Sequence, residues 1–126
     1  MRLLVILIAL FAAIITAGFW TNHLLEASTA GLLENMDKIG VEIKKENWEN
    51  AYRQTIDLEK VWDEKARWWP MVLDHQEMDN IEFALARFKE YVDTRDLSLS
   101  RGQLAELRLM IKHIPEKESI RIKNIL

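Results

Sequence analysis

The residues best suited to chemistry lie in one acidic stretch, Asp74-His75-Gln76-Glu77-Met78-Asp79, which is followed by Glu82. Residues three and four apart share a helix face, so His75, Asp79 and Glu82 would lie together in a helix. An imidazole and two carboxylates can bind one metal ion, although zinc normally takes three or four protein ligands. The competing interpretation is a histidine that is hydrogen-bonded inside the fold, beside acids that favour a helix N-terminus. We predict this second, structural interpretation, with no metal and no cofactor.

Enzyme signatures are missing from the sequence, which contains no nucleophile elbow, phosphate loop, HExxH or CxxC motif. Its 20 acidic residues are spread over amphipathic segments, where acids usually form a solvated surface. No pair of carboxylates is singled out for general acid and base catalysis. The sequence therefore predicts a protein that is not an enzyme, and a hydrolase is the lowest-ranked alternative.

An uncharged apolar stretch, LLVILIALFAAIITAGFW, occupies residues 3–20. At about 1.5 Å per residue it would be roughly 27 Å long, close to the hydrocarbon core of a bilayer at about 30 Å. A cleaved signal peptide would have a shorter apolar region with a small-x-small site close behind it. The chain also has no cysteine that could carry a lipid. We therefore predict an uncleaved transmembrane anchor over residues 1–22.

Charge predicts the orientation of this anchor. Arg2 precedes the apolar stretch, whereas Glu26, Glu34 and Asp37 follow it before the first later Lys or Arg. The positive-inside rule then places the N-terminus in the cytoplasm and residues 23–126 outside it, as a single-pass protein of the cell membrane. That part carries 16 of the 17 Lys and Arg and all 20 Asp and Glu, so its net charge is 16 − 20 = −4. An acidic balance argues against nucleic acid as a partner.

Helical periodicity continues beyond the anchor. One apolar seam over residues 21–45 consists of Leu25, Thr29, Leu32, Met36, Ile39 and Ile43. This spacing fits a helix that packs against later helices of its own chain, with dimerisation as the alternative. No proline separates the seam from the anchor, so both can belong to one helix of about 60 Å.

A second helix is predicted from a cap at Asn47 to about Trp69. Its most distinctive feature is a stripe of residues seven apart, which are Trp48, Thr55, Trp62 and Trp69. Tryptophans at this spacing are more often core than a ligand site, because each can bury about 200 Å². Trp68 faces another direction in such a helix, and we expect it to be exposed or at a contact.

Two more helices are predicted after Pro70. The third runs from about Met71 to Asp93, with an expected inner face of His75, Met78, Ile81, Leu85, Phe88 and Val92. The fourth is capped by Ser98 or Ser100, buries Leu104, Leu107, Ile111 and Ile114, and ends at Pro115, so residues 115–126 form a short extended tail. The predicted fold is all-α, with an N-terminal transmembrane helix that continues into an antiparallel bundle of three to four helices.

A row of small residues four apart, Ala9, Ala13 and Ala17, lies within the apolar stretch. Such a row lets another transmembrane helix approach closely. It predicts packing against a partner helix, either in a multi-pass membrane protein or in a second copy of the chain. The sequence thus favours a non-enzymatic accessory protein that interacts with the bilayer and another membrane protein. The alternative is an extracytoplasmic sensor module that binds a ligand or metal.

The chain resembles a family of small, single-pass, membrane-anchored bacterial proteins that is catalogued as a domain of unknown function (family 4363). The resemblance follows the N-terminal apolar stretch and covers nearly the whole length. It rests on Trp48, Trp62, Trp68, His75-x-Glu77-x-Asp79, Arg87-x3-Tyr91, Glu106-Leu107 and Asn124-Ile125-Leu126. It implies an anchored all-helical domain with no assigned activity and no catalytic residues.

Overall fold

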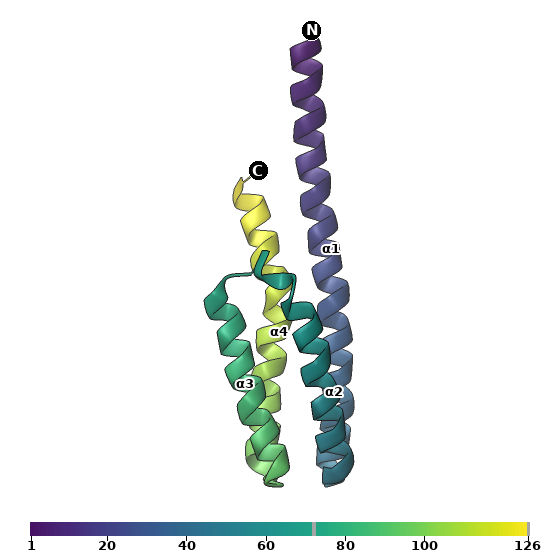
Figure 1. The fold of residues 1–126 in the computed structure, drawn as a ribbon, viewed down its shortest axis with the longest axis vertical. Coiled ribbons are helices and arrows are strands. Elements are labelled where there is room, and N and C mark those ends of the chain that lie inside the picture. Colours follow the sequence, from purple (N-terminus) through teal and green to yellow (C-terminus); the bar gives the residue numbers. More distant parts are fainter. Residues whose placement is uncertain (72, 126) are drawn as a thin grey trace.

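The computed structural model describes the backbone of residues 1–71 and 73–125, and the side chains of residues 1–70 and 73–115. This part of the chain forms four α-helices and no strand. They are α1 (Arg2–Lys44), α2 (Trp48–Ala66), α3 (His75–Asp93) and α4 (Leu97–Ile125), with a short 3₁₀ turn η1 (Trp69–Met71) after α2. Successive helices run in opposite directions, and the N-terminal half of α1 projects beyond the others (Figure 1). The predicted all-α class and antiparallel bundle are confirmed.

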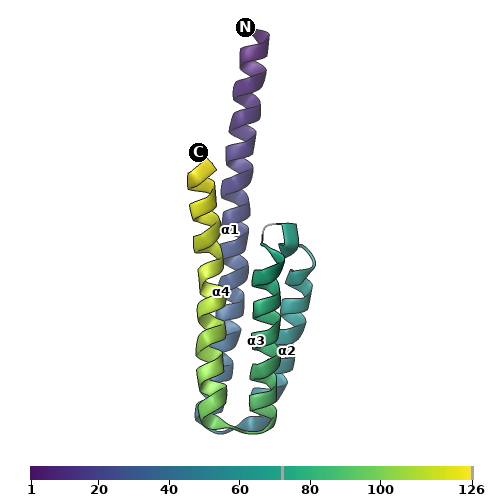
Figure 2. The same cartoon turned by 90° about the vertical axis from the view of Figure 1, so that its left-hand side faces the viewer.

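Helix α1 is continuous from the apolar stretch into the bundle. Its 43 residues correspond to about 64 Å at the usual helical rise. The whole predicted seam is buried, from Leu25 at 0% exposure to Ile43 at 0%. The seam packs inside its own chain, as predicted, because α2 and α4 both lie along this half of α1 (Figure 2).

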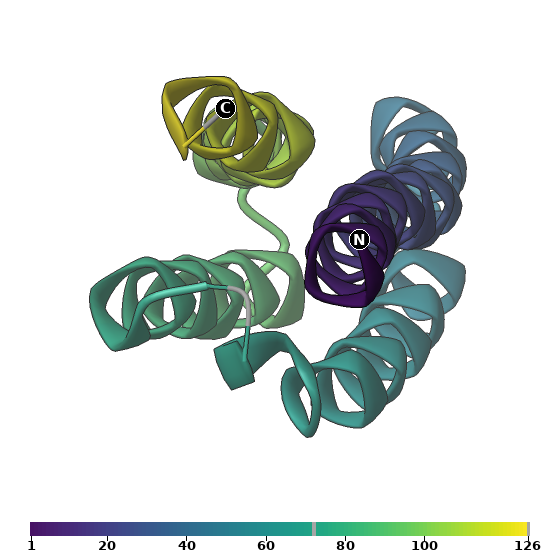
Figure 3. The same cartoon turned by 90° about the horizontal axis from the view of Figure 1, so that it is seen from above.

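Each helix packs against two neighbours, so the four form a ring when viewed along the bundle (Figure 3). Two ion pairs join neighbouring helices. Arg108 Nε of α4 lies 3.0 Å from Asp37 Oδ1 of α1, and Lys89 Nζ of α3 lies 3.2 Å from Glu59 Oε2 of α2. Because these side chains are partly exposed, the pairs add little stability, but they show which residues of neighbouring helices face each other.

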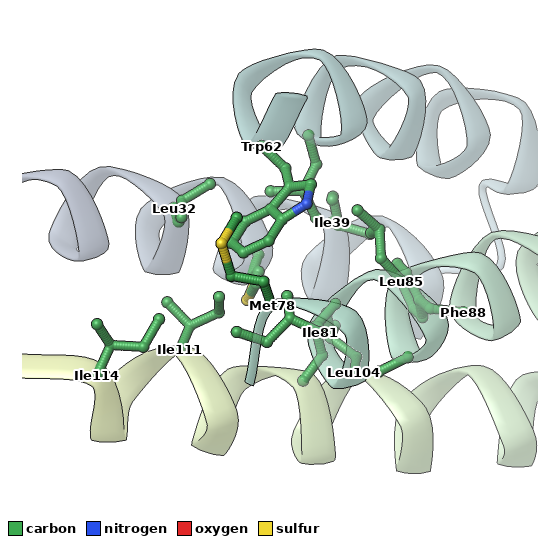
Figure 4. Packing of buried hydrophobic residues seen from close by; sticks show 14 of the residues in the cluster. Leu32, Ile39, Trp62, Met78, Ile81, Leu85, Phe88, Leu104, Ile111 and Ile114 are labelled. Carbon is green, nitrogen blue, oxygen red and sulfur yellow. The ribbon is translucent and has the colours of Figure 1, made fainter. Parts of the chain in front are cut away.

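The core receives side chains from all four helices, including Leu32, Trp62, Phe88 and Ile111 (Figure 4). The predicted tryptophan stripe is part of it, since Thr55, Trp62 and Trp69 are at most 2% exposed and Trp48 packs partly buried against the cluster. Trp68 is half-buried and contacts Trp69 edge to face, with ring centroids 5.9 Å apart. The two rings can touch because the α-helix has already ended, at Ala66.

The connection between α2 and α3 differs from the prediction. Helix α2 ends at Ala66 rather than near Trp69, and α3 begins at His75 rather than Met71. Pro70 lies in η1 instead of in the first turn of α3. Asp74 is the residue that precedes and caps α3. Its backbone is extended and not helical, and its Oδ1 accepts a 2.8 Å hydrogen bond from the Glu77 N–H.

Both predicted ends of the fourth helix are wrong. Helix α4 is capped by Asp96, whose Oδ1 accepts a 2.8 Å hydrogen bond from the Leu99 N–H, while Ser98 and Ser100 lie inside the helix. Pro115 also lies inside α4, which continues to Ile125 instead of giving way to an extended tail. The fixed φ of proline suits a helix, and the Glu-Lys-Glu that follows favours helical structure, so the lost hydrogen bond is tolerated.

The two phenylalanines of α3 allow a matched test of this core. Phe88 is 0% exposed and Phe83 is 60% exposed. We expect Phe88→Ala to lower the free energy of unfolding by about 3–5 kcal/mol, through lost burial and the cavity that remains. Phe83→Ala should change it by less than about 0.5 kcal/mol. Denaturant unfolding of the full chain in detergent, followed by circular dichroism, measures both, and equal losses would contradict this packing.

Candidate functional site

The most unusual surface of the molecule is the N-terminal half of α1. No residue from 2 to 20 is buried, and large apolar side chains such as Leu10 and Trp20 are 58% and 65% exposed. An 18-residue window of this helix has a mean hydropathy of 2.7, and none of that window is buried. By length and composition, this part of α1 could cross a membrane.

The environment of α1 changes within about one turn. Thr21 and Asn22 are half-buried, and Leu25 is the first fully buried residue. Before Leu25, the hydroxyls of Thr16 and Thr21 each donate a 2.8 Å hydrogen bond to the backbone carbonyl of the residue four positions earlier. Their polar groups are therefore satisfied within the helix, as a helix surrounded by lipid requires.

The predicted partner-helix residues Ala9, Ala13 and Ala17 lie on this uncovered half, and all three are exposed. Because consecutive members of the row are four residues apart on a continuous helix, they share one face. A face of small side chains lets another helix approach closely.

The predicted metal candidates do not form a site. His75 is the first residue of α3 and is exposed, as are Asp79 and Glu82. In residues 1–70 and 73–115, no three His, Cys, Asp or Glu side chains come close enough to hold one metal ion. The expectation that His75 belongs to the inner face of α3 is also wrong. His75 is the first residue of α3, and the buried face of this helix begins only at Met78.

Sequence reasoning missed a groove of about 360 Å³ between α3 and α4. Apolar side chains such as Ile81 and Met110 line it together with Glu77, Glu106 and His113. Its walls come from segments about 30 residues apart in the chain, so no local motif marks it. Mixed apolar and polar walls can accommodate a small amphipathic ligand.

These features define the class of the protein: an antiparallel helical bundle with an apolar N-terminal extension long enough to cross a membrane. Residues 19–125 match the family model described as a domain of unknown function (DUF4363), and the chain belongs to this family. The match begins at Phe19, so it covers the bundle and leaves most of the apolar stretch outside. Comparisons with curated proteins and with solved structures gave no match.

The exposed position of His75 leads to a test of the metal hypothesis. We expect His75→Ala to change the free energy of unfolding by less than about 0.5 kcal/mol, because no buried hydrogen bond is lost. We also expect zinc or manganese to leave the melting temperature of both proteins unchanged. Thermal unfolding with and without each ion measures this. A metal-dependent rise in the wild type that is absent from the variant would restore the metal site.

Proposed function

We propose that this protein is a single-pass membrane protein whose bundle is an accessory, non-enzymatic module for another membrane protein. The observation that carries the proposal is the change along α1, from a completely uncovered apolar half to a half buried in the bundle. An uncovered row of large apolar side chains is costly in water and favourable in lipid. A continuous helix would then couple the position of the bundle directly to the bilayer.

The proposed orientation has the N-terminus in the cytoplasm and the bundle outside. It is supported by Arg2 before the apolar stretch and by Glu26, Glu34 and Asp37 after it. The bundle is then an extracytoplasmic domain in a compartment where its lack of cysteine leaves stability to helix packing alone.

A single introduced cysteine tests this orientation cleanly, because the chain has none of its own. Ser98 is exposed and lies in the first turn of α4, and this helix begins at the end of the bundle furthest from the apolar stretch (Figure 1). We expect Ser98→Cys to react with a membrane-impermeant maleimide in intact cells, and to the same extent after permeabilisation. The measurement is the labelled fraction by mass shift. Labelling only after permeabilisation would place the bundle in the cytoplasm.

The proposed partner surface is the row of Ala9, Ala13 and Ala17. Its small side chains would let a helix of a multi-pass membrane protein pack closely against α1 inside the bilayer. Leucine at these positions would hold the two helix backbones apart, so bulky substitutions on this face should weaken the complex.

We expect the triple variant A9L/A13L/A17L to lose about tenfold or more of a membrane partner that co-purifies with the wild type in mild detergent. Phe11→Trp is the control that adds bulk on the opposite face, because residue 11 is turned about 200° from residue 13. The measurement is quantitative mass spectrometry of the purified complex. If the wild type purifies as a monomer or homodimer, or if both variants keep the partner, the accessory role through this face is wrong.

A second candidate function, a ligand-binding sensor module, is favoured by the groove between α3 and α4. Its volume of about 360 Å³ lies within the usual range of small-molecule sites. The two functions differ in where a partner binds: the accessory role depends on the apolar half of α1, whereas the sensor role depends on the groove. Substitution of Met110, in the groove, should affect the second function alone.

A further inference from the structure

One end of the bundle faces the apolar half of α1. It consists of the α2–α3 connection and the last turns of α4, which lie at the end from which α1 projects (Figure 1). Contacts between the helices show which residues of α1 lie beside this end of the bundle. Arg108 of α4 pairs with Asp37 of α1, and a Cβ placed on Gly40 would lie 3.4 Å from Leu104 Cδ2. Both contacts define the same antiparallel register.

This register can be followed to the end of α4. Ile125 lies 17 residues beyond Arg108, and 17 residues back from Asp37 is Trp20, the last residue of the apolar stretch. The last turn of α4 therefore lies level with the end of the proposed span. In the sequence this part of α4 combines Lys117, Arg121 and Lys123 with three isoleucines.

The α2–α3 connection also lies near the end of the apolar stretch. Lys38 of α1 and Gln54 of α2 line one surface hollow. Twelve residues on from Gln54, α2 ends at Ala66, and 12 residues back from Lys38 is Glu26. Glu26 is six residues beyond Trp20, or about 9 Å along the helix axis. The headgroup layer of a bilayer is about 5–7 Å thick on each side.

We propose that this end of the bundle lies at the phospholipid headgroup layer of the bilayer that α1 crosses, with the last turn of α4 in that layer and residues 67–70 at its outer edge. The inference rests on the proposed membrane anchoring. It adds two lipid contacts, at residues 67–70 and at the end of α4, to the one made by α1. Three contacts would hold the bundle in one orientation relative to the membrane.

The side chains of the α2–α3 connection suit this environment. Arg67 is exposed, and its guanidinium can bind a lipid phosphate. Trp68 is half-buried, and tryptophan is enriched where headgroups meet the hydrocarbon. Its ring contacts Trp69, which contacts Trp62 in the core at a centroid distance of 5.3 Å, both edge to face. This row of rings connects Trp68, the proposed lipid contact, to the core of the bundle.

Single-cysteine variants of the full-length protein test the proposal in vesicles of phosphatidylcholine and phosphatidylglycerol in equal parts. A fluorophore is attached at Arg67→Cys, Lys123→Cys or Ser98→Cys, and quenching by lipids with a spin-labelled headgroup is measured. Position 98 is the matched control, because it is exposed but lies about 30 Å further along the helices. Ala13→Cys, measured with lipids spin-labelled in the acyl chain, reports the anchor.

We expect quenching at positions 67 and 123 to exceed that at position 98 about tenfold, since a quencher must come close to the dye and position 98 lies well outside the bilayer. If either position gives the value found at 98 while position 13 is quenched from within the bilayer, the headgroup contact is wrong and the anchor stands. If position 13 is not quenched from within the bilayer, the anchor fails, and this inference fails with it.

Discussion

The buried seam of α1 is the contact on which the bundle depends. Both α2 and α4 pack along it, and α3 packs mainly against α2 and α4. Each large apolar side chain in the seam contributes on the order of 1.5–3 kcal/mol through its removal from water. The same helix leaves its other half without any cover. These two halves need different surroundings, and the boundary between them lies between Thr21 and Leu25.

The tryptophans shape the end of the bundle from which α1 projects. Trp62 and Trp69 are buried edge to face, and neither indole N–H has an acceptor among the residues that the structure describes. Burying such donors costs free energy, which the large apolar area of the rings offsets. Packing here therefore outweighs hydrogen bonding. It holds η1 against the core although the α-helix has ended three residues earlier, at Ala66.

The charged side chains of the described surface show how the helices are aligned. Its acids are mostly exposed, and the ion pairs between helices show which residues of α1 and α4, and of α2 and α3, face each other. That register determines the level at which α4 ends beside α1, and so it connects packing in the core with the proposed position at a membrane. Family membership leaves the activity open, which gives the geometry of α1 and the bundle end particular weight in any functional proposal.

The sequence by itself determined the apolar stretch, the α1 seam and the inner stripes of the later helices, because side-chain periodicity alone shows which face of a helix avoids water. It did not determine where helices begin and end. Asp74 and Asp96 cap helices that serines or a proline were expected to start, and Pro115 lies inside α4. The two caps are local contacts, but several residues near each start could have formed them, and only the folded chain shows which one does. The exposure of His75 and the α3–α4 groove were decided by the tertiary structure alone, since both depend on neighbours distant in the chain.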